Sequence, residues 1–239
     1  KPIKGVDNLE VINLDPLEAA HNYKESVVGP FRGKLPDSVI ENMEEQLSGS
    51  CTVEIAAFNE FSNFITNSKL NTDYNHIIFD TAPKAHTLRM LQLPSAWTDF
   101  ISESTHGASC LGQLSGLDSK KETYKKAVEN LSDKSLTTLV LVTRPDKTPL
   151  NEVARASKEL SEIGIKNQIL VINGVLEHYD DDLSESIFNK QKLALENMPE
   201  MLTEFDTYTI ALRSYNITGI DSIRNLLKKD QINEQKVEV

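Results

Sequence analysis

The alternation of short apolar runs with helical patterns in the second half of the chain constrains the fold more than any other feature. Apolar runs typical of strands cover residues 137–143, 168–173 and 208–212, and a helical pattern follows each one. Strands that alternate with helices in this way pair in parallel through right-handed crossovers. We therefore predict an α/β fold with a doubly wound, mostly parallel sheet. The expected helices cover residues 149–163, 183–197 and 220–227.

The first half of the chain is expected to be mainly helical, with two short strands. Helical patterns cover residues 16–28, 38–47 and 52–65, and the last of them carries its apolar side chains on one face. Residues 9–14 have the pattern of a short strand. Residues 76–80 have the pattern of a fully buried strand, because consecutive apolar positions suit a sheet that is covered on both faces.

Length and composition favour one domain. A chain of 239 residues can bury most of the apolar surface of its unfolded form, and 39% hydrophobic with 26% charged residues is ordinary for a globular protein. We therefore interpret residues 1–239 as a single domain. Glycine and serine residues interrupt the alternation at 95–131, which we interpret as a helical insertion with loops. The charged tail at 229–239 is expected to fray.

Charge and the lengths of the apolar runs exclude two kinds of partner. The net charge of −11 repels nucleic-acid phosphates, and no cluster of basic residues offsets it. Apolar runs such as residues 139–142 are too short to cross a bilayer, so no direct membrane insertion is expected. Two cysteines and the lack of a signal-peptide pattern favour the cytoplasm. The first residue is Lys1, so we expect the natural N-terminus to lie upstream.

A segment in the middle of the chain is typical of ATPases that handle phosphate. The apolar run at 76–79 is followed by Asp80, Thr81 and Pro83, and a helical pattern opens at His86. A carboxylate at the carboxyl end of a strand can hold Mg²⁺ through water beside a nucleotide, and the loop after it can sense the γ-phosphate. Considered alone, Asp80 could equally be a helix N-cap or a turn carboxylate.

The loop that should cradle the phosphates is missing from the sequence. Such a loop is rich in glycine, wraps the phosphates with backbone N–H groups and ends in Lys followed by Ser or Thr. The nearest candidate, residues 29–35, is one residue short between its glycines, contains Pro30 and ends in Leu35 where a hydroxyl is needed. We interpret it as an ordinary turn between two helices. The chain thus has the second half of an ATPase site without the first.

These residues resemble the arsenical pump-driving ATPase family, ArsA. The segment at 77–83 continues through a His-Thr-Leu-Arg that begins at His86, and further segments match at the spacing of the family. The chain is similar to the first of the two homologous halves of bacterial ArsA, truncated before the phosphate-binding loop. The resemblance covers nearly the whole chain. The further segments are residues 47–58, 107–112, 163–168 and 171–176.

The resemblance implies a soluble ATPase that powers arsenite or antimonite efflux, uses ATP with Mg²⁺ and is stimulated by As(III) or Sb(III). The implied partners are a membrane arsenite extruder of the ArsB type and either a second ATPase half or another copy of the chain. The protein would be cytoplasmic and peripheral to the inner face of the membrane through that transporter. Whether the chain is itself an enzyme stays open, because the family's phosphate loop and the aspartate that orients the attacking water are absent. The chain alone is expected to be inactive.

The resemblance also implies roles for residues near the nucleotide. Asp80, Thr81 and Pro83 match the family's nucleotide switch, and Asn173 matches a residue that hydrogen-bonds the adenine. The residues alone equally allow Asn173 to start a turn with Gly174.

The switch departs from the family pattern directly after the proline. The family has Thr-Gly at this point, where this chain has Lys84 and Ala85. Replacement of Gly by Ala costs little only where φ is negative, so the loop could be stiffer or shifted. Lys84 could also contact a phosphate or the partner half.

Cys51, Cys110 and His86 are the candidate metal ligands. Spacing alone does not indicate a site, because the two cysteines are far apart and each could be a small apolar residue or a free thiol. The same reasoning allows His86 to be a helix N-terminal residue held by backbone. As(III) and Sb(III) favour thiolates, with imidazole as a secondary ligand, and the resemblance implies that all three residues serve the metalloid site. A third thiol would come from another ATPase half.

Two other functions remain open. A non-catalytic metalloid-binding or regulatory subunit could use Cys51 and Cys110 alone. An ATPase that targets tail-anchored membrane proteins, like the eukaryotic relatives of ArsA, is a further alternative. It is weakened because the chain has no zinc-binding Cys-x-x-Cys and only four scattered Met residues.

Overall fold

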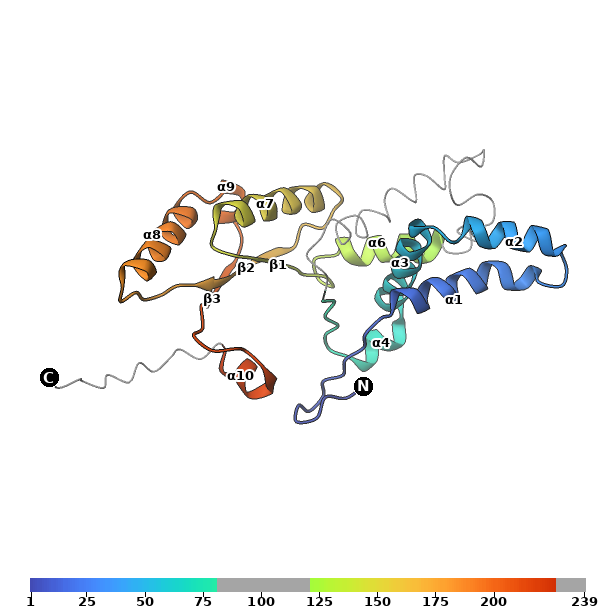
Figure 1. Cartoon of the computed structure of the whole chain (residues 1–239), viewed down its shortest axis with the longest axis horizontal. Coiled ribbons are helices and arrows are strands. Elements are labelled where there is room, and N and C mark those ends of the chain that lie inside the picture. The colour runs from blue at the N-terminus through green and yellow to red at the C-terminus, as the bar shows by residue number, and fades with distance from the viewer. Residues whose placement is uncertain (81–120, 227–239) are drawn as a thin grey trace. The chain divides into compact units, whose positions relative to one another are not determined.

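The structure, a computed structural model, describes residues 1–80 and 121–226 of the chain (Figure 1). The chain divides into two compact units. The sheet unit contains Lys1–Ile12, Val140–Ser157 and the described residues from Gln168 onward. The helical unit contains the described residues of Asn13–Leu139 together with Lys158–Asn167.

The sheet unit is built on strands that pair in parallel. Within the described residues, β1 (Leu139–Thr143), β2 (Gln168–Val175) and β3 (Thr207–Ala211) form a three-stranded sheet in the order β1-β2-β3. β2 pairs with β3 in parallel, with Leu170 opposite Thr207. Buried positions recur at every second residue along most of β2. The prediction of an α/β fold with a mostly parallel sheet is therefore confirmed.

Helices connect these strands, as the alternation predicts. α7 (Lys147–Glu162) joins β1 to β2, whereas α8 (Asp182–Glu196) and the short α9 (Glu200–Thr203) join β2 to β3. α8 starts with a capping box, in which the side chains of Asp181 and Ser184 each accept from the other residue's backbone N–H. The helical segment after β3 is α10 (Gly219–Asn225).

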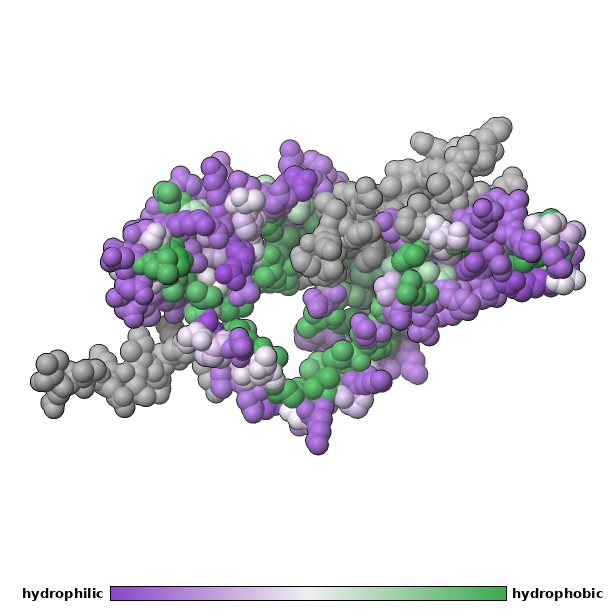
Figure 2. Space-filling view, in the orientation of Figure 1, coloured by the Kyte–Doolittle hydropathy of each residue, from purple (hydrophilic) through white to green (hydrophobic). Residues whose placement is uncertain are grey.

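The outer surface of α8 is partly apolar. Leu183 and Leu193 on this helix are exposed, and Figure 2 shows hydrophobic residues in green at the surface over it. The ring of Tyr179, which precedes the helix, pairs with that of Phe188 in its middle, with centroids 5.1 Å apart. α8 therefore presents more apolar surface than a fully solvated helix face normally does.

The helical unit has a core of its own. The buried rings of Phe58 on α3 and Tyr124 on α6 lie 4.9 Å apart between centroids, and the Tyr124 hydroxyl donates to the side chain of Asn59. Burial raises the pKa of Tyr124 because it disfavours the phenolate. The α-helices of this unit are α1 (Pro16–Val28), α2 (Asp37–Gln46), α3 (Ser50–Thr66), α4 (Ser68–Asp73) and α6 (Lys121–Ser132).

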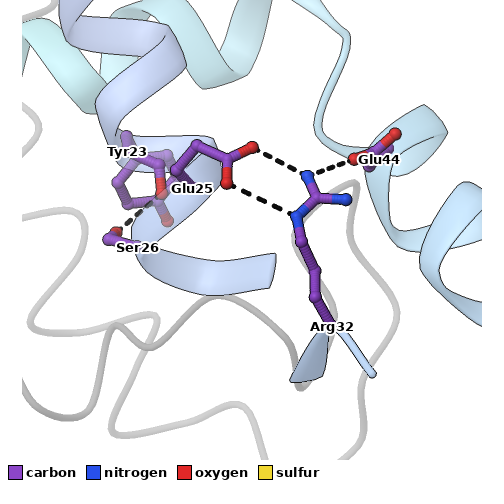
Figure 3. A network of polar contacts seen from close by, with 5 residues as sticks. All are labelled: Tyr23, Glu25, Ser26, Arg32 and Glu44. Atoms are coloured by element: carbon purple, nitrogen blue, oxygen red, sulfur yellow. Dashed lines mark hydrogen bonds and ion pairs between the residues drawn. The ribbon is translucent and has the colours of Figure 1, made fainter. Parts of the chain in front are cut away.

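The segment that came nearest to a phosphate loop is a turn between two helices. It begins with the 3₁₀ helix η1 (Gly29–Phe31) and leads into α2. Figure 3 shows Arg32 of this turn between Glu25 of α1 and Glu44 of α2. The Arg32 Nη2 atom lies 2.7 Å from Glu25 Oε1 and 2.5 Å from Glu44 Oε1. Arg32 is thus bound to carboxylates of the two flanking helices, in agreement with the interpretation of the segment as a turn.

The predictions of two strands in the first half of the chain are wrong. Residues 9–14 contribute only an isolated antiparallel bridge between Pro2 and Glu10. Residues 76–80 are irregular, and Ile78 is 88% exposed. A strand needs hydrogen-bonding partners on a neighbouring strand, and in the described residues neither run is paired into the sheet. The apolar pattern indicated that these residues favour burial, but it gave no information about a neighbouring strand with which they could pair.

The rest of the predicted insertion and tail can be followed only in part. α6 begins at Lys121, inside the region interpreted as a helical insertion, whereas residues 95–120 and 229–239 lie outside the described residues. In the part of the chain that is described, no helix is both long and apolar enough to cross a membrane.

Candidate functional site

A cation and an amide lie at the carboxyl ends of β1 and β2. Arg144 follows β1 directly, and Asn173 lies near the end of β2; both residues are exposed. Ligands of parallel α/β sheets bind outside the carboxyl ends of the strands. This edge is therefore the best-defined place for a ligand in the sheet unit.

Gly174 allows the Arg144 side chain to approach the backbone of β2 closely. Its φ of +82° is a left-handed conformation that glycine adopts without strain. A Cβ atom at this position would lie 3.0 Å from Cζ and from Nη1 of Arg144. The Arg144 guanidinium thus lies against the backbone of Gly174, the residue next to Asn173, and a Cβ there would crowd it.

The loop after β1 is tied down on both sides of Arg144. Thr143 and Pro145 are buried, and Asp146 forms an ion pair with Lys190 of α8, with 2.6 Å between Oδ1 and Nζ. The carbonyl of Asp146 also accepts from the Leu150 N–H in the first turn of α7. Arg144 is therefore the exposed member of an anchored loop.

The end of β2 is held by a residue that the sequence did not indicate. Gln191 of α8 is only 7% exposed, accepts from the Leu176 N–H at 2.8 Å and donates to the Gly174 carbonyl at 3.2 Å. No motif marks Gln191, because a glutamine in an amphipathic helix usually faces solvent. Its role could not have been found from the pattern.

This arrangement suits recognition of a heteroaromatic base that carries phosphates. The Asn173 amide offers both a donor and an acceptor, as an adenine edge requires, and the Arg144 guanidinium offers charge and several N–H donors. Asn173 was a candidate from the sequence, whereas the contact of Arg144 with Gly174 appears only in the structure.

Asp80 lies at the end of the described part of the helical unit. It is exposed and belongs to the irregular segment 76–80. The ring of the preceding Phe79 packs edge-on against Phe61 of α3, with 4.8 Å between centroids. α3 also carries Cys51 in its first turn, because the helix begins at Ser50, two residues before its predicted start. The structure therefore connects the helix that carries one candidate ligand to the segment that carries the candidate carboxylate.

The remaining candidates lie outside the described residues. They are Thr81, Pro83, His86 and Cys110, together with the departure at Lys84 and Ala85. Among the residues that are described, no group of three or more His, Cys, Asp or Glu side chains could hold a metal ion.

Comparison with known proteins places the chain in a family. A family model described as anion-transporting ATPase matches residues 1–231. An arsenical pump-driving ATPase of Acidiphilium multivorum is 48% identical over 95% of this chain and 40% of its own length. A protein of the same name from Escherichia coli is 47% identical over 96% of this chain and 40% of its own length.

A more distant relative covers a larger share of its own length. The ATPase GET3 of Debaryomyces hansenii is 26% identical over 95% of this chain and 73% of its own length. By contrast, the chain spans 40% of the length of the arsenical pump-driving ATPases that it matches. The resemblance seen in the motifs is confirmed, and the chain belongs to the anion-transporting ATPase family of ArsA type.

Proposed function

We propose that this chain is the nucleotide-binding part of an ATPase that powers the efflux of arsenite or antimonite. The observation that carries the proposal is the placement of Arg144 and Asn173 at the carboxyl ends of β1 and β2, where parallel sheets bind nucleotides. Family membership supports ATP as the nucleotide, and the similarity to arsenical pump-driving ATPases supports the transported substrate.

Each candidate residue has a role in this proposal. Asn173 binds the adenine edge, and Arg144 supplies positive charge beside it. Asp80 holds Mg²⁺ through water, because a carboxylate is the usual ligand of this hard cation. Thr81 and Pro83 continue the switch that responds to the γ-phosphate. Residues 1–239 act as one ATPase domain.

The chain by itself is expected to lack activity. Its sequence contains no Gly-rich loop ending in Lys-Ser or Lys-Thr, and phosphoryl transfer depends on such a cradle to position and neutralise the phosphates. We therefore assign hydrolysis to the full-length protein, with a second ATPase half or another copy of the chain as partner.

The metalloid site in this proposal uses Cys51, Cys110 and His86. Thiolates are the preferred ligands of As(III) and Sb(III), and the position of Cys51 in the first turn of α3 places its backbone at the positive end of a helix dipole. Bound metalloid would stimulate ATP hydrolysis. ATP hydrolysis would power a membrane extruder of the ArsB type, to which the protein would bind from a peripheral position on the cytoplasmic face.

Hydrolysis by the full-length protein, measured with and without antimonite, tests the proposal. We expect antimonite to raise the rate and Asp80→Asn to abolish hydrolysis, because the magnesium carboxylate is lost. We also expect His86→Ala to reduce the ratio of stimulated to unstimulated rates. His178→Ala is the matched control, since His178 is exposed and has no assigned role.

Three results would contradict parts of the proposal. A wild-type rate that antimonite leaves unchanged would remove the metalloid function. Equal stimulation ratios for His86→Ala and His178→Ala would remove His86 from the site. Full hydrolysis by Asp80→Asn would remove the assigned magnesium carboxylate.

A further inference from the structure

β2 continues beyond the end of its neighbour β1. The two strands begin level, since the Leu139 N–H donates to the carbonyl of Asn167 at 2.9 Å. β1 ends at Thr143 and is followed by the buried Pro145, which has no N–H to donate, while β2 runs on to Val175. The last residues of β2 therefore need hydrogen-bond partners other than β1.

Gln191 supplies those partners from α8. Its side-chain amide accepts from Leu176 N–H and donates to the Gly174 carbonyl, as a neighbouring strand would. Between these two groups, the carbonyl of Val175 accepts from the Leu212 N–H just beyond β3, at 2.8 Å. The chain after Asn173 is thus held by β3 and by one buried side chain.

The backbone at this point depends on those bonds. The pairing of β2 with β3 is irregular between Asn173 and Val175, and Gly174 is left-handed. Val175, Leu176, Phe188 and Leu195 also line an apolar groove against Gln191. Without the Gln191 amide, two backbone groups would lose their partners in a largely apolar setting.

We propose that Gln191 is a positioning residue for nucleotide recognition: by clamping the backbone on the far side of Gly174, it holds the strand end from which Asn173 projects in one place and so favours adenine. This inference rests on the proposed role of Asn173 at the base. An amide in one fixed direction matches the donor and acceptor of the adenine edge, whereas guanine presents an oxygen where adenine presents an amino group. An Asn173 side chain on a loose strand end could adapt its position to either base.

Nucleotide binding to the full-length protein, with ATP and GTP compared by calorimetry, tests the inference. We expect Gln191→Leu to lower the ratio of ATP to GTP affinity by about tenfold, the equivalent of one hydrogen bond to the base. Gln191→Glu keeps the acceptor for Leu176 but loses the donor to Gly174, so an intermediate ratio is expected.

Gln168→Leu is the matched control. Gln168 lies at the opposite end of β2, is 6% exposed and bonds twice to Ser157, through its Oε1 at 2.6 Å and its Nε2 at 3.3 Å. It removes a buried amide from the same strand without touching the Asn173 segment. We expect it to lower the melting temperature as Gln191→Leu does, but to keep the ATP to GTP ratio of the wild type.

The role of Asn173 itself is tested by Asn173→Ala in the same assay. Loss of the ratio in Asn173→Ala and Gln191→Leu, but not in Gln168→Leu, supports the positioning role. If Asn173→Ala loses the ratio and Gln191→Leu keeps it, the positioning role is overturned while the proposed base contact stands. An unchanged ratio in Asn173→Ala overturns both.

Discussion

Similar apolar runs adopt different structures in the sheet unit and in the helical unit. Residues 168–173 and residues 76–80 both have the apolar pattern of a buried strand, yet only the first run forms one. Leu170 in β2 is fully buried between neighbours, whereas Ile78 is almost entirely exposed. An apolar run therefore indicates only that its side chains favour burial. A strand forms where a neighbouring strand also supplies backbone hydrogen bonds.

The candidate residues Asn173 and Asp80 lie on segments that are held in different ways. Asn173 lies on a strand whose end is bonded to β3 and to Gln191. Asp80 lies on an irregular segment, in which the ring of Phe79 packs against that of Phe61. The strand end that carries Asn173 is therefore held by hydrogen bonds, whereas the segment that carries Asp80 packs against α3 through one ring.

The largest difference in stability is expected between variants that shorten one apolar side chain in each run. Leu170→Ala should lower the free energy of unfolding by about 2–5 kcal/mol, because it opens a cavity in the sheet unit. Ile78→Ala should change it by less than about 0.5 kcal/mol, because little surface is lost from burial. Urea unfolding of the two variants measures both values. A comparable cost for Ile78→Ala would show that residues 76–80 are buried after all and would break the comparison.

A smaller effect is expected for the ring contact between α3 and the segment of Asp80. A double-mutant cycle with Phe61→Leu and Phe79→Leu should give a coupling free energy of about 0.5–1.5 kcal/mol, the usual value of an aromatic pair beyond its buried area. The cycle of Phe61→Leu with Ile78→Ala is the control and should be additive, since Ile78 is exposed. Additivity in the first cycle would leave Asp80 without a packed connection to α3.

The smallest effect is expected for the Arg32 contacts at the surface of the helical unit. The hydrogen bond from Arg32 lowers the pKa of Glu25 below its ordinary value of 4.5. Because this pKa is lower in the folded than in the unfolded chain, the contact stabilises the fold above pH 4.5 and loses this effect as the pH falls through the folded value.

Melting curves of the wild type and of Arg32→Gln at neutral and at acidic pH test this expectation. The variant should melt slightly lower at neutral pH, and the gap should close below pH 4.5 and in high salt. Arg155→Gln, which removes an exposed pair with Glu152, is the control. A gap that persists in acid would mean that Arg32 acts through packing.

Much of the fold could be predicted because the sequence pattern of a helix depends only on residues that are close in the chain. The pattern at 16–28 agrees with the bounds of α1, and the turn at 29–35 follows from Pro30 and the wrong glycine spacing. The candidate site was only partly predictable. Asn173 stood out at a strand end beside a glycine, but Gln191 is separated from it by a loop and half a helix. No local rule connects two such positions.

The sequence by itself determined the family, the alternation of strands and helices, and the identity of the candidate ligands, since motifs and periodicity depend only on neighbouring residues. The tertiary structure decided which apolar runs became strands, that Arg144 lies against Gly174, and that Gln191 closes the end of β2. The physical reason is the range of the hydrogen bonds involved. A helix satisfies its backbone within four residues, whereas a strand or a clamped loop depends on partners that only folding brings near.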